Sequence, residues 1–192
     1  LFYDNIEQEQ WAYLKQQIDI FCQEQAYWLD DFVHYCAFRD HFELKPWNQW
    51  PDALRQHEDQ AINQYANTLS EKINRYTFEQ FAFFEQWKCL RAYAKQKSIE
   101  FFGDIPIFVG HDSADVWGNQ SQFLLDETGA PISVAGVPPD YFSETGQHWG
   151  NPHYHWENMQ ADGFVWWKNR LRTQLQSFDI LRIDHFRGFE AY

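Results

Sequence analysis

Arg182 and Asp184 are the residues of this chain whose types and spacing most directly suggest chemistry. They lie in the largely apolar segment Asp179–Gly188, and in a β-strand residues i and i+2 project to the same face. A neighbouring cation favours the ionised form of a carboxyl group and lowers its pKa. An ionised aspartate at the carboxyl end of a strand is suited to act as a carboxylate nucleophile. The alternative is a buried ion pair that only fixes the register of the strand.

Several longer motifs precede this strand along the chain. In order, the motifs are Gly103–Val109, Asp112–Trp117, Ala135–Gly146, Trp149–Pro152 and finally Arg182–Phe189. Together they resemble the 4-α-glucanotransferases of the amylomaltase (disproportionating enzyme) family, glycoside hydrolase family 77. The resemblance is strong from about Gly103 to the end of the chain and looser before it. Several long motifs in the right order are a specific signal, unlike one short pattern.

The resemblance implies a retaining α-glucan transferase of the α/β class, with this chain as an internal fragment of a (β/α)₈ barrel. It assigns Asp184 as the nucleophile that forms a covalent glucosyl-enzyme, and Arg182 as the residue that holds and ionises it. The substrate-binding residues that it implies are Asp104, Asp140, Tyr141, Phe142, Trp149, Asn151 and His185. The family uses no organic cofactor and no catalytic metal.

The same resemblance implies that the general-acid glutamate and a third carboxylate lie beyond the end of this sequence. We therefore expect the fragment alone to be inactive. The implied partners are maltooligosaccharides and α-1,4-glucans as donors, with glucose or another glucan as the acceptor. Two rival functions remain open, namely an α-amylase-like glucan hydrolase and a non-catalytic glucan-binding segment.

Length and composition bound the class of protein. The chain has 192 residues, whereas a (β/α)₈ barrel typically needs about 250, and Leu1 is not an initiator methionine, so we expect a longer parent. The net charge of −13 disfavours binding to nucleic acid. No apolar run approaches the roughly 20 residues of a membrane span. Cys22, Cys36 and Cys89 show no CxxC spacing and indicate reduced thiols in a cytoplasmic protein.

Residues 1–97 are expected to form a helical region, namely an inserted helical subdomain plus one barrel helix. Thr77 and Gln80 have the spacing of a capping box, which predicts the start of a helix. The apolar face of this helix is formed by Phe81, Phe84 and Trp87, and we assign it to core packing. The segment Pro46–Pro51 is interpreted as a connector.

Residues 98–192 are expected to form part of the catalytic barrel. Ile99–Val109 has the composition of a strand, and Pro106 predicts its end or a bulge because proline cannot donate to a sheet ladder. Asp104 lies near that end, where the active sites of barrels are found. The alternative interpretation is that Asp104 caps a local turn.

Shorter elements are predicted after this strand. Asp112 and Ser113 are expected to cap a short helix at Ala114–Trp117. Leu124–Ile132 is interpreted as a small hairpin with Gly129 in its turn.

Residues 136–151 show no clear period and are interpreted as an active-site loop, because a loop this long within a compact domain is usually functional. The resemblance implies that the loop arches over the cleft and that Tyr141, Phe142 and Trp149 contact glucose rings. Exclusion of water by these rings would favour transfer over hydrolysis. The alternative is that the three aromatic side chains only attach the loop to the barrel.

The last predicted helix is capped by Asp162 and runs to about Ser177. Its apolar face is formed by Phe164, Trp167, Leu171, Leu175 and Phe178. With the strand 179–184 that follows, it completes a β/α unit of a parallel sheet. The histidines that precede it are His148, His153 and His155. They are interpreted as surface residues and not as metal ligands, because no nearby cysteine completes a zinc pattern.

Overall fold

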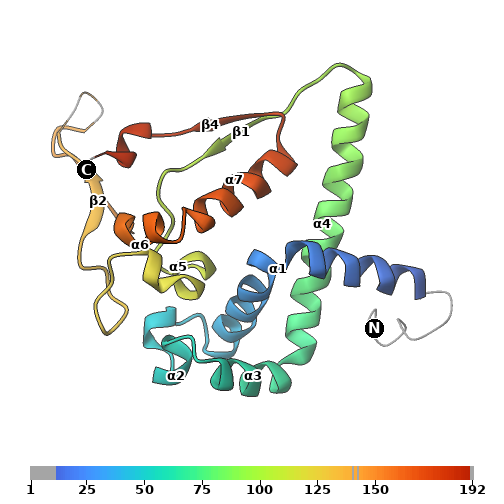
Figure 1. Ribbon diagram of the computed structural model, residues 1–192, viewed down its shortest axis with the longest axis horizontal. Coiled ribbons are helices and arrows are strands. Elements are labelled where there is room, and N and C mark those ends of the chain that lie inside the picture. The colour runs from blue at the N-terminus through green and yellow to red at the C-terminus, as the bar shows by residue number, and fades with distance from the viewer. Residues whose placement is uncertain (1–11, 140, 142, 191–192) are drawn as a thin grey trace.

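The computed structural model describes residues 12–139, 141 and 143–190 (Figure 1). The helices are α1 (Ala12–His41), α2 (Asp52–Arg55), α3 (Asp59–Thr68), α4 (Ser70–Gln96), α5 (Ala114–Gly118), α6 (Trp156–Ala161) and α7 (Val165–Ser177). The strands are β1 (Phe102–Ile105), β2 (Val134–Val137), β3 (Gln147–Pro152) and β4 (Ile180–Ile183). Short 3₁₀ helices are η3 (Trp47–Gln49), η4 (Gln120–Gln122) and η5 (Phe186–Phe189). In the described part, no helix is both long and apolar enough to cross a membrane.

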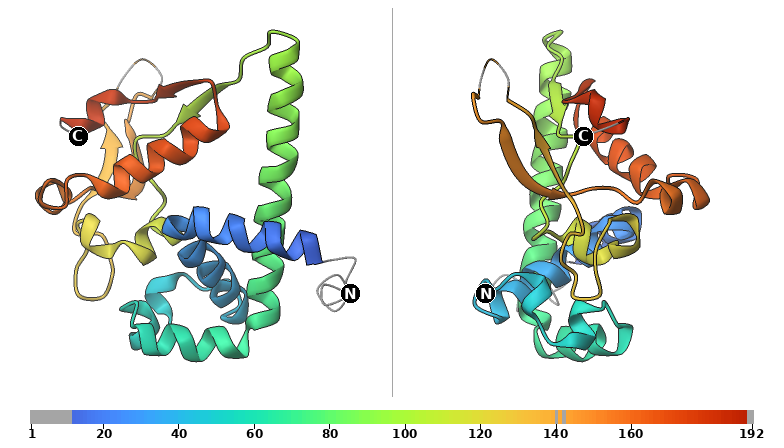
Figure 2. Two further views of the ribbon diagram at one scale, coloured as in Figure 1. Left: turned by 45° about the vertical axis from the view of Figure 1, so that its right-hand side comes forward. Right: turned by 90° about the vertical axis from the view of Figure 1, so that its left-hand side faces the viewer.

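The helices expected in the first half are present, and α1 crosses the long helix α4 (Figure 2). An apolar cluster joins them, in which Phe81 of α4 packs against Phe21 of α1 with ring centroids 5.8 Å apart. The predicted start of a helix at Thr77 is wrong, because α4 already begins at Ser70. The Thr77 hydroxyl lies inside the helix and donates to the carbonyl of Ile73 at 2.9 Å. Its hydroxyl thus bonds to the preceding turn and caps nothing.

The segment Pro46–Pro51 is more than a connector. Trp47 and Trp50 are 0 % and 3 % exposed and belong to the main hydrophobic core. The Trp47 indole donates to the carbonyl of His111 at 2.7 Å. The two prolines therefore bound a 3₁₀ turn that inserts two large rings into the main core, beside His111 and Trp117.

The functional half is organised around two parallel strands, β1 and β4. In Figure 1 they run side by side, with α7 packed along them. The register pairs Phe102 with Ile180 and Ile105 with Ile183. β1 ends at Ile105, immediately before Pro106, as the missing N–H of proline predicts. The expected β/α unit with a parallel connection is confirmed.

Helix α7 covers only one face of this pair, and its predicted apolar stripe is only partly buried. Trp166 and Trp167 are 8 % and 5 % exposed, whereas Leu175 is 55 % exposed. The N-cap of α7 is Phe164 and not the predicted Asp162, although the Asp162 carboxylate accepts a hydrogen bond from the backbone N–H of Val165 at 3.2 Å. The buried side of α7 is therefore set by the tryptophan pair at its first turn.

The loop predicted at residues 136–151 is flanked by two strands that the sequence did not predict. β2 and β3 form an antiparallel pair, in which Gly136 lies opposite His148 and Val137 opposite Gln147. A side chain on Gly136 would meet the Gln147 carbonyl oxygen at 2.6 Å, so the close approach of the strands requires glycine. Glycine and proline hide the alternation of apolar residues by which a strand is recognised.

The hairpin expected at Leu124–Ile132 is reduced to a tight turn. Leu125 and Pro131 form an isolated bridge, and Gly129 adopts a φ of 77°. The Asp126 carboxylate accepts hydrogen bonds within this turn, including one from the backbone N–H of Thr128 at 2.8 Å. Because Pro131 has no N–H, the ladder does not extend.

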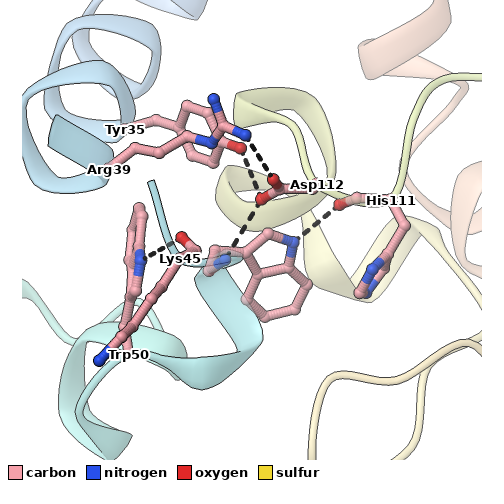
Figure 3. A network of polar contacts seen from close by, with 7 residues as sticks. Tyr35, Arg39, Lys45, Trp50, His111 and Asp112 are labelled. Atoms are coloured by element: carbon pink, nitrogen blue, oxygen red, sulfur yellow. Dashed lines mark hydrogen bonds and ion pairs between the residues drawn. The ribbon is translucent and has the colours of Figure 1, made fainter. Parts of the chain in front are cut away.

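Asp112 connects the helical half to the segment after β1 (Figure 3). Its carboxylate accepts from the Tyr35 hydroxyl at 2.7 Å, the Arg39 guanidinium at 3.0 Å and the Trp47 backbone N–H at 3.3 Å. Burial, and then the bond to Asp112, raise the pKa of Tyr35. The prediction that Asp112 caps α5 is wrong, whereas Ser113 is the cap. The hydrogen-bonding partners of Asp112 lie far away in the sequence, so a local pattern does not reveal them.

Replacement of Asp112 tests this connection. We expect Asp112→Ala to lower the free energy of unfolding by about 2–3 kcal/mol, because it leaves a hydroxyl, a guanidinium and an N–H without their acceptor. Chemical denaturation measures the change. Glu85→Ala is the matched control, since Glu85 pairs only with the exposed Lys88 at 3.6 Å, and its expected cost is about 0.5 kcal/mol or less. Equal effects of the two substitutions would contradict the assigned role.

Candidate active site

The parallel register of β1 and β4 brings two charged side chains together. Asp104 is the direct neighbour of Arg182 across the pair. The Arg182 Nε donates to Asp104 Oδ1 at 3.1 Å, and its Nη2 bonds the other carboxylate oxygen. Arg182 was expected to hold Asp184, but its direct partner is Asp104. A residue two positions along a strand is about 6.6 Å away, farther than the neighbour across the ladder.

Each member of this pair favours the charged form of the other. The hydrogen bond from Arg182, and then its charge, hold the pKa of Asp104 below its ordinary value. The bond to Asp104 raises the pKa of Arg182, and the nearby charge of Asp184 adds to this effect. Arg182 therefore lies within electrostatic reach of both carboxylates while it binds only Asp104 directly.

Asp184 lies just beyond the end of β4, where the chain leaves the sheet. Its backbone N–H donates to the Ile105 carbonyl at 3.0 Å, which extends the pairing by one residue. His185 then adopts a left-handed conformation with φ 47°, and η5 follows. This sharp turn leaves the Asp184 side chain half exposed. The His185 Nε2 lies 3.8 Å from Asp184 Oδ2, within reach of an ion pair when the imidazole is protonated.

A hollow of about 470 Å³ joins Asp184 to residues of the β2–β3 hairpin. Its lining is formed by Pro106, Ile107, Phe108, Gln147, Trp149, Asn151, Asp184 and His185. The rings of Trp149 and His185 meet edge to face, with centroids 4.8 Å apart. The Asn151 amide donates to the Val109 carbonyl at 2.8 Å and thereby attaches β3 to the segment after β1.

Of the remaining candidates, the structure describes Tyr141 alone. Tyr141 lies between β2 and β3 and is 97 % exposed. Asp140 and Phe142 lie outside the described residues. The structure thus brings Asp184, His185, Trp149 and Asn151 into one hollow, with Asp104 and Arg182 behind Asp184 on the strands, and Tyr141 does not line it.

Sequence reasoning missed two residues that bind the backbone of the segment lining this hollow. Tyr154 donates to the Ile107 carbonyl at 2.6 Å, and Arg170 donates to the Pro106 carbonyl at 2.7 Å. A signal was present, because Arg170 follows Trp166 and Trp167 on the buried side of α7, where an arginine requires polar partners.

The histidines have local structural roles. His153 Nδ1 lies 2.9 Å from the Ser133 hydroxyl, and burial lowers the pKa of His153. His155 caps α6 by accepting from the backbone N–H of Asn158 at 3.3 Å. Among the described residues, no cluster of three histidine, cysteine, aspartate or glutamate side chains is arranged to bind a metal ion.

A second cavity, of about 360 Å³, lies between α1, α5 and α7. Asp115 and Arg170 line it, whereas Asp104, Arg182 and Asp184 do not. Burial raises the pKa of Asp115. The nucleophile candidate Asp184 does not line this cavity but lines the hollow at the ends of β1 and β4.

Comparisons with known proteins identify the family that this chain resembles. A family model described as 4-alpha-glucanotransferase matches residues 1–192. A 4-alpha-glucanotransferase of Synechocystis is 47 % identical over 93 % of this chain and 36 % of its own length. The corresponding protein of Thermus thermophilus is 48 % identical over 90 % of this chain and 34 % of its own length. The chain therefore spans about a third of these relatives.

A solved structure is similar over almost all of the described fold. It is the amylomaltase of Streptococcus agalactiae in complex with acarbose. The TM-score is 0.89 at 37 % identity, and the match covers 98 % of this chain and 37 % of that one.

The pH dependence of stability tests the Asp104–Arg182 pair. Because the pKa of Asp104 is lowered from 3.8 in the folded protein, the contribution of the pair is fully present above about pH 4 and is lost as the pH falls through the lower folded-state value. We expect Asp104→Asn to lower the melting temperature at pH 7 by more than at pH 3. Asp19→Asn, at an exposed position of α1, is the control. If Asp104→Asn lowers the melting temperature equally at pH 7 and pH 3, the pairing of Asp104 with Arg182 is contradicted.

Proposed function

This chain belongs to the 4-alpha-glucanotransferase family, and we propose on that premise that it carries the nucleophile of a retaining 4-alpha-glucanotransferase. Donor and acceptor are α-1,4-glucans and maltooligosaccharides, and glucose also serves as an acceptor. The observation that carries the proposal is the position of Asp184, half exposed at the carboxyl end of β4, in one hollow with Trp149, Asn151 and His185. In barrel enzymes, catalytic residues lie at the carboxyl ends of strands.

The reaction is a double displacement. The Asp184 carboxylate attacks the anomeric carbon of the donor, and the bond from that carbon to the leaving 4-oxygen breaks as a general acid protonates this oxygen. The 4-hydroxyl of the acceptor then attacks the same carbon, gives up its proton to the same acid–base residue and releases Asp184. Two inversions retain the α configuration. Retaining enzymes hold the two carboxyl groups about 5–5.5 Å apart, so the acid–base glutamate comes from a strand outside this chain.

Arg182 and Asp104 keep this end of the sheet charged and ordered. Asp104 orients the guanidinium through two hydrogen bonds, and a planar guanidinium held in this way is preorganised. The charge of Arg182 also lies within electrostatic reach of Asp184. The hydrogen bonds of Arg182 run to Asp104, so we assign Arg182 as a positioning residue of this strand end.

The β2–β3 hairpin sets the balance between transfer and hydrolysis. Trp149 contacts His185 beside the nucleophile, and the exposed Tyr141 is available to stack on a sugar ring. Asp140 and Phe142 flank Tyr141 in the sequence, and we assign them to the acceptor side from the family resemblance. Exclusion of water from the covalent intermediate leaves a sugar hydroxyl as the better acceptor.

The whole enzyme is a (β/α)₈ barrel, and β1, α7 and β4 are one unit of it. Phe102, Asp104, Ile180 and Arg182 occupy one exposed face of the strand pair, which is the interior face of the closed barrel. Residues 98–192 are the partial catalytic barrel. Residues 1–97 are the inserted helical subdomain with one barrel helix. An isolated fragment lacks the acid–base residue and is inactive.

We place the enzyme in the cytoplasm. The three cysteines at positions 22, 36 and 89 are all free thiols, as in proteins of reducing compartments. The reaction needs no cofactor and no metal, because the carboxylates provide both the nucleophile and the acid–base group.

Replacement of Asp184 tests the nucleophile. In the full-length protein we expect Asp184→Asn to reduce conversion of maltotriose by at least about 10⁴-fold, while calorimetric binding of maltotriose persists because an amide fills the same space. Wild-type protein should yield glucose together with maltotetraose and longer chains. Glucose and maltose alone would indicate a hydrolase, and binding without conversion by the wild type would indicate a glucan-binding protein. Activity of Asp184→Asn near that of the wild type would contradict the assignment.

Replacement of Tyr141 tests the hairpin. We expect Tyr141→Ala to raise the ratio of hydrolysis to transfer several-fold, because water then reaches the intermediate more easily. Chromatography of the maltotriose products measures this ratio. The melting temperature should not change, since the side chain is exposed. Tyr13→Ala on α1, at a position 72 % exposed, controls for loss of a surface tyrosine, and an unchanged ratio in Tyr141→Ala would argue against the role of the hairpin.

A further inference from the structure

Arg170 of α7 connects the buried side of the helix to the segment that follows β1. Its Nη2 donates to the Pro106 carbonyl at 2.7 Å, and its Nη1 lies 3.4 Å from the Ile107 carbonyl. The guanidinium also stacks near the rings of Trp166 and Trp167, at 5.3 and 4.9 Å from their centroids. A single arginine thus bonds two successive backbone carbonyls while two indoles limit its movement.

Tyr154 completes this arrangement. Its hydroxyl donates to the Ile107 carbonyl at 2.6 Å and accepts from Arg170 at 3.2 Å. Tyr154 is 3 % exposed, and its ring stacks on Phe108 with centroids 5.6 Å apart. Burial lowers the pKa of Arg170 and raises that of Tyr154. An arginine nevertheless stays charged in proteins, so these are charge-assisted hydrogen bonds.

These bonds replace a sheet ladder where it stops. β1 ends at Ile105, and the carbonyls of Pro106 and Ile107 lie beyond it. Carbonyl groups at such a position need partners other than a neighbouring strand. Arg170 and Tyr154 supply them from the side of α7, and Asn151 holds the next part of the segment through the Val109 carbonyl at 2.8 Å.

The same segment forms one wall of the hollow, because Pro106, Ile107 and Phe108 line it opposite Trp149 and beside Asp184. We propose that Arg170, together with Tyr154, is a positioning residue that fixes this wall and thereby sets the affinity of the site for its glucan. The inference rests on the proposed function, in which this hollow receives the donor.

The nucleophile itself does not depend on Arg170. Asp184 is held by its backbone bond to Ile105 at 3.0 Å and lies beside the Asp104–Arg182 pair. When Arg170 is truncated, the wall loosens while the nucleophile keeps its place. Interactions made equally in the ground state and the transition state affect KM and leave kcat unchanged. Substitution of Arg170 is therefore expected to raise KM and to leave kcat nearly constant.

Steady-state kinetics of the full-length protein with maltotriose tests the inference. We expect Arg170→Met to raise KM about tenfold with kcat changed by less than about threefold. Tyr154→Phe should raise KM less, because Arg170 still holds Pro106. Arg170→Lys should restore part of the affinity, because an ammonium group can reach a carbonyl but lacks the fork of a guanidinium. These two conservative variants keep the test valid if Arg170→Met fails to fold.

Arg172→Met is the matched control. Arg172 lies on the same helix, bonds Asn169 at 3.1 Å and lies 5.9 Å from the ring of Tyr27, without a hydrogen bond to the segment after β1. We expect its KM and kcat to equal those of the wild type. An unchanged KM in the Arg170 and Tyr154 variants, with kcat lowered in proportion to the folded fraction, would show that they only stabilise the fold and would overturn the inference.

Calorimetric titration with maltotriose separates this inference from the proposed function. If the wild type binds maltotriose but does not convert it, the transferase proposal fails, and weaker binding by Arg170→Met than by Arg172→Met still supports the positioning role. Equal binding by these two variants overturns it. A wild type that does not bind maltotriose overturns both.

Discussion

The parallel register of β1 and β4 is the constraint on which the rest of the structure depends. It places Asp104 against Arg182 and leaves Asp184 one residue beyond the ladder. Side chains alternate between the faces of a strand, so a shift of one residue would turn Arg182 away from Asp104 and Asp184 away from the hollow. Both strands have only four residues, and their own hydrogen bonds are too few to prevent such a shift.

Contacts outside the ladder therefore fix the register at both ends. At its start, Asp179 accepts from the Phe101 N–H at 2.9 Å and from Arg91 of α4 at 2.5 Å, and these bonds lower the pKa of Asp179. At its end, Arg170 holds the Pro106 carbonyl. Asp112 joins α1 to the segment beyond. The helices thus hold the two short strands in place. They do so largely through hydrogen bonds of charged side chains, such as those of Asp179 with Arg91 and the Phe101 N–H and that of Arg170 with the Pro106 carbonyl.

Features set by neighbouring residues could be predicted from the sequence, and features set by distant partners could not. Pro106 ends β1 and Ser113 caps α5 as expected, because both effects act within a few residues. The partner of Arg182 is 78 positions away, so the sequence suggested Asp184, which is near along the chain, and did not pair Arg182 with Asp104. The hairpin at 136–151 was missed because its glycines and prolines hide strand periodicity. The assignments of Asp184, Trp149, Asn151 and His185 came from motif resemblance, and composition alone would not have produced them.

The central claim is that Asp184 forms the covalent bond to glucose. The most direct test is to incubate the full-length protein with a 5-fluoro-α-glucosyl fluoride, whose good leaving group needs little acid assistance, and to locate the trapped sugar by peptide mass spectrometry. We predict one added fluoroglucosyl group on the peptide that contains Asp184, and its absence in Asp184→Asn. A sugar attached to another carboxylate, or turnover with inversion and no labelled peptide, would contradict the account.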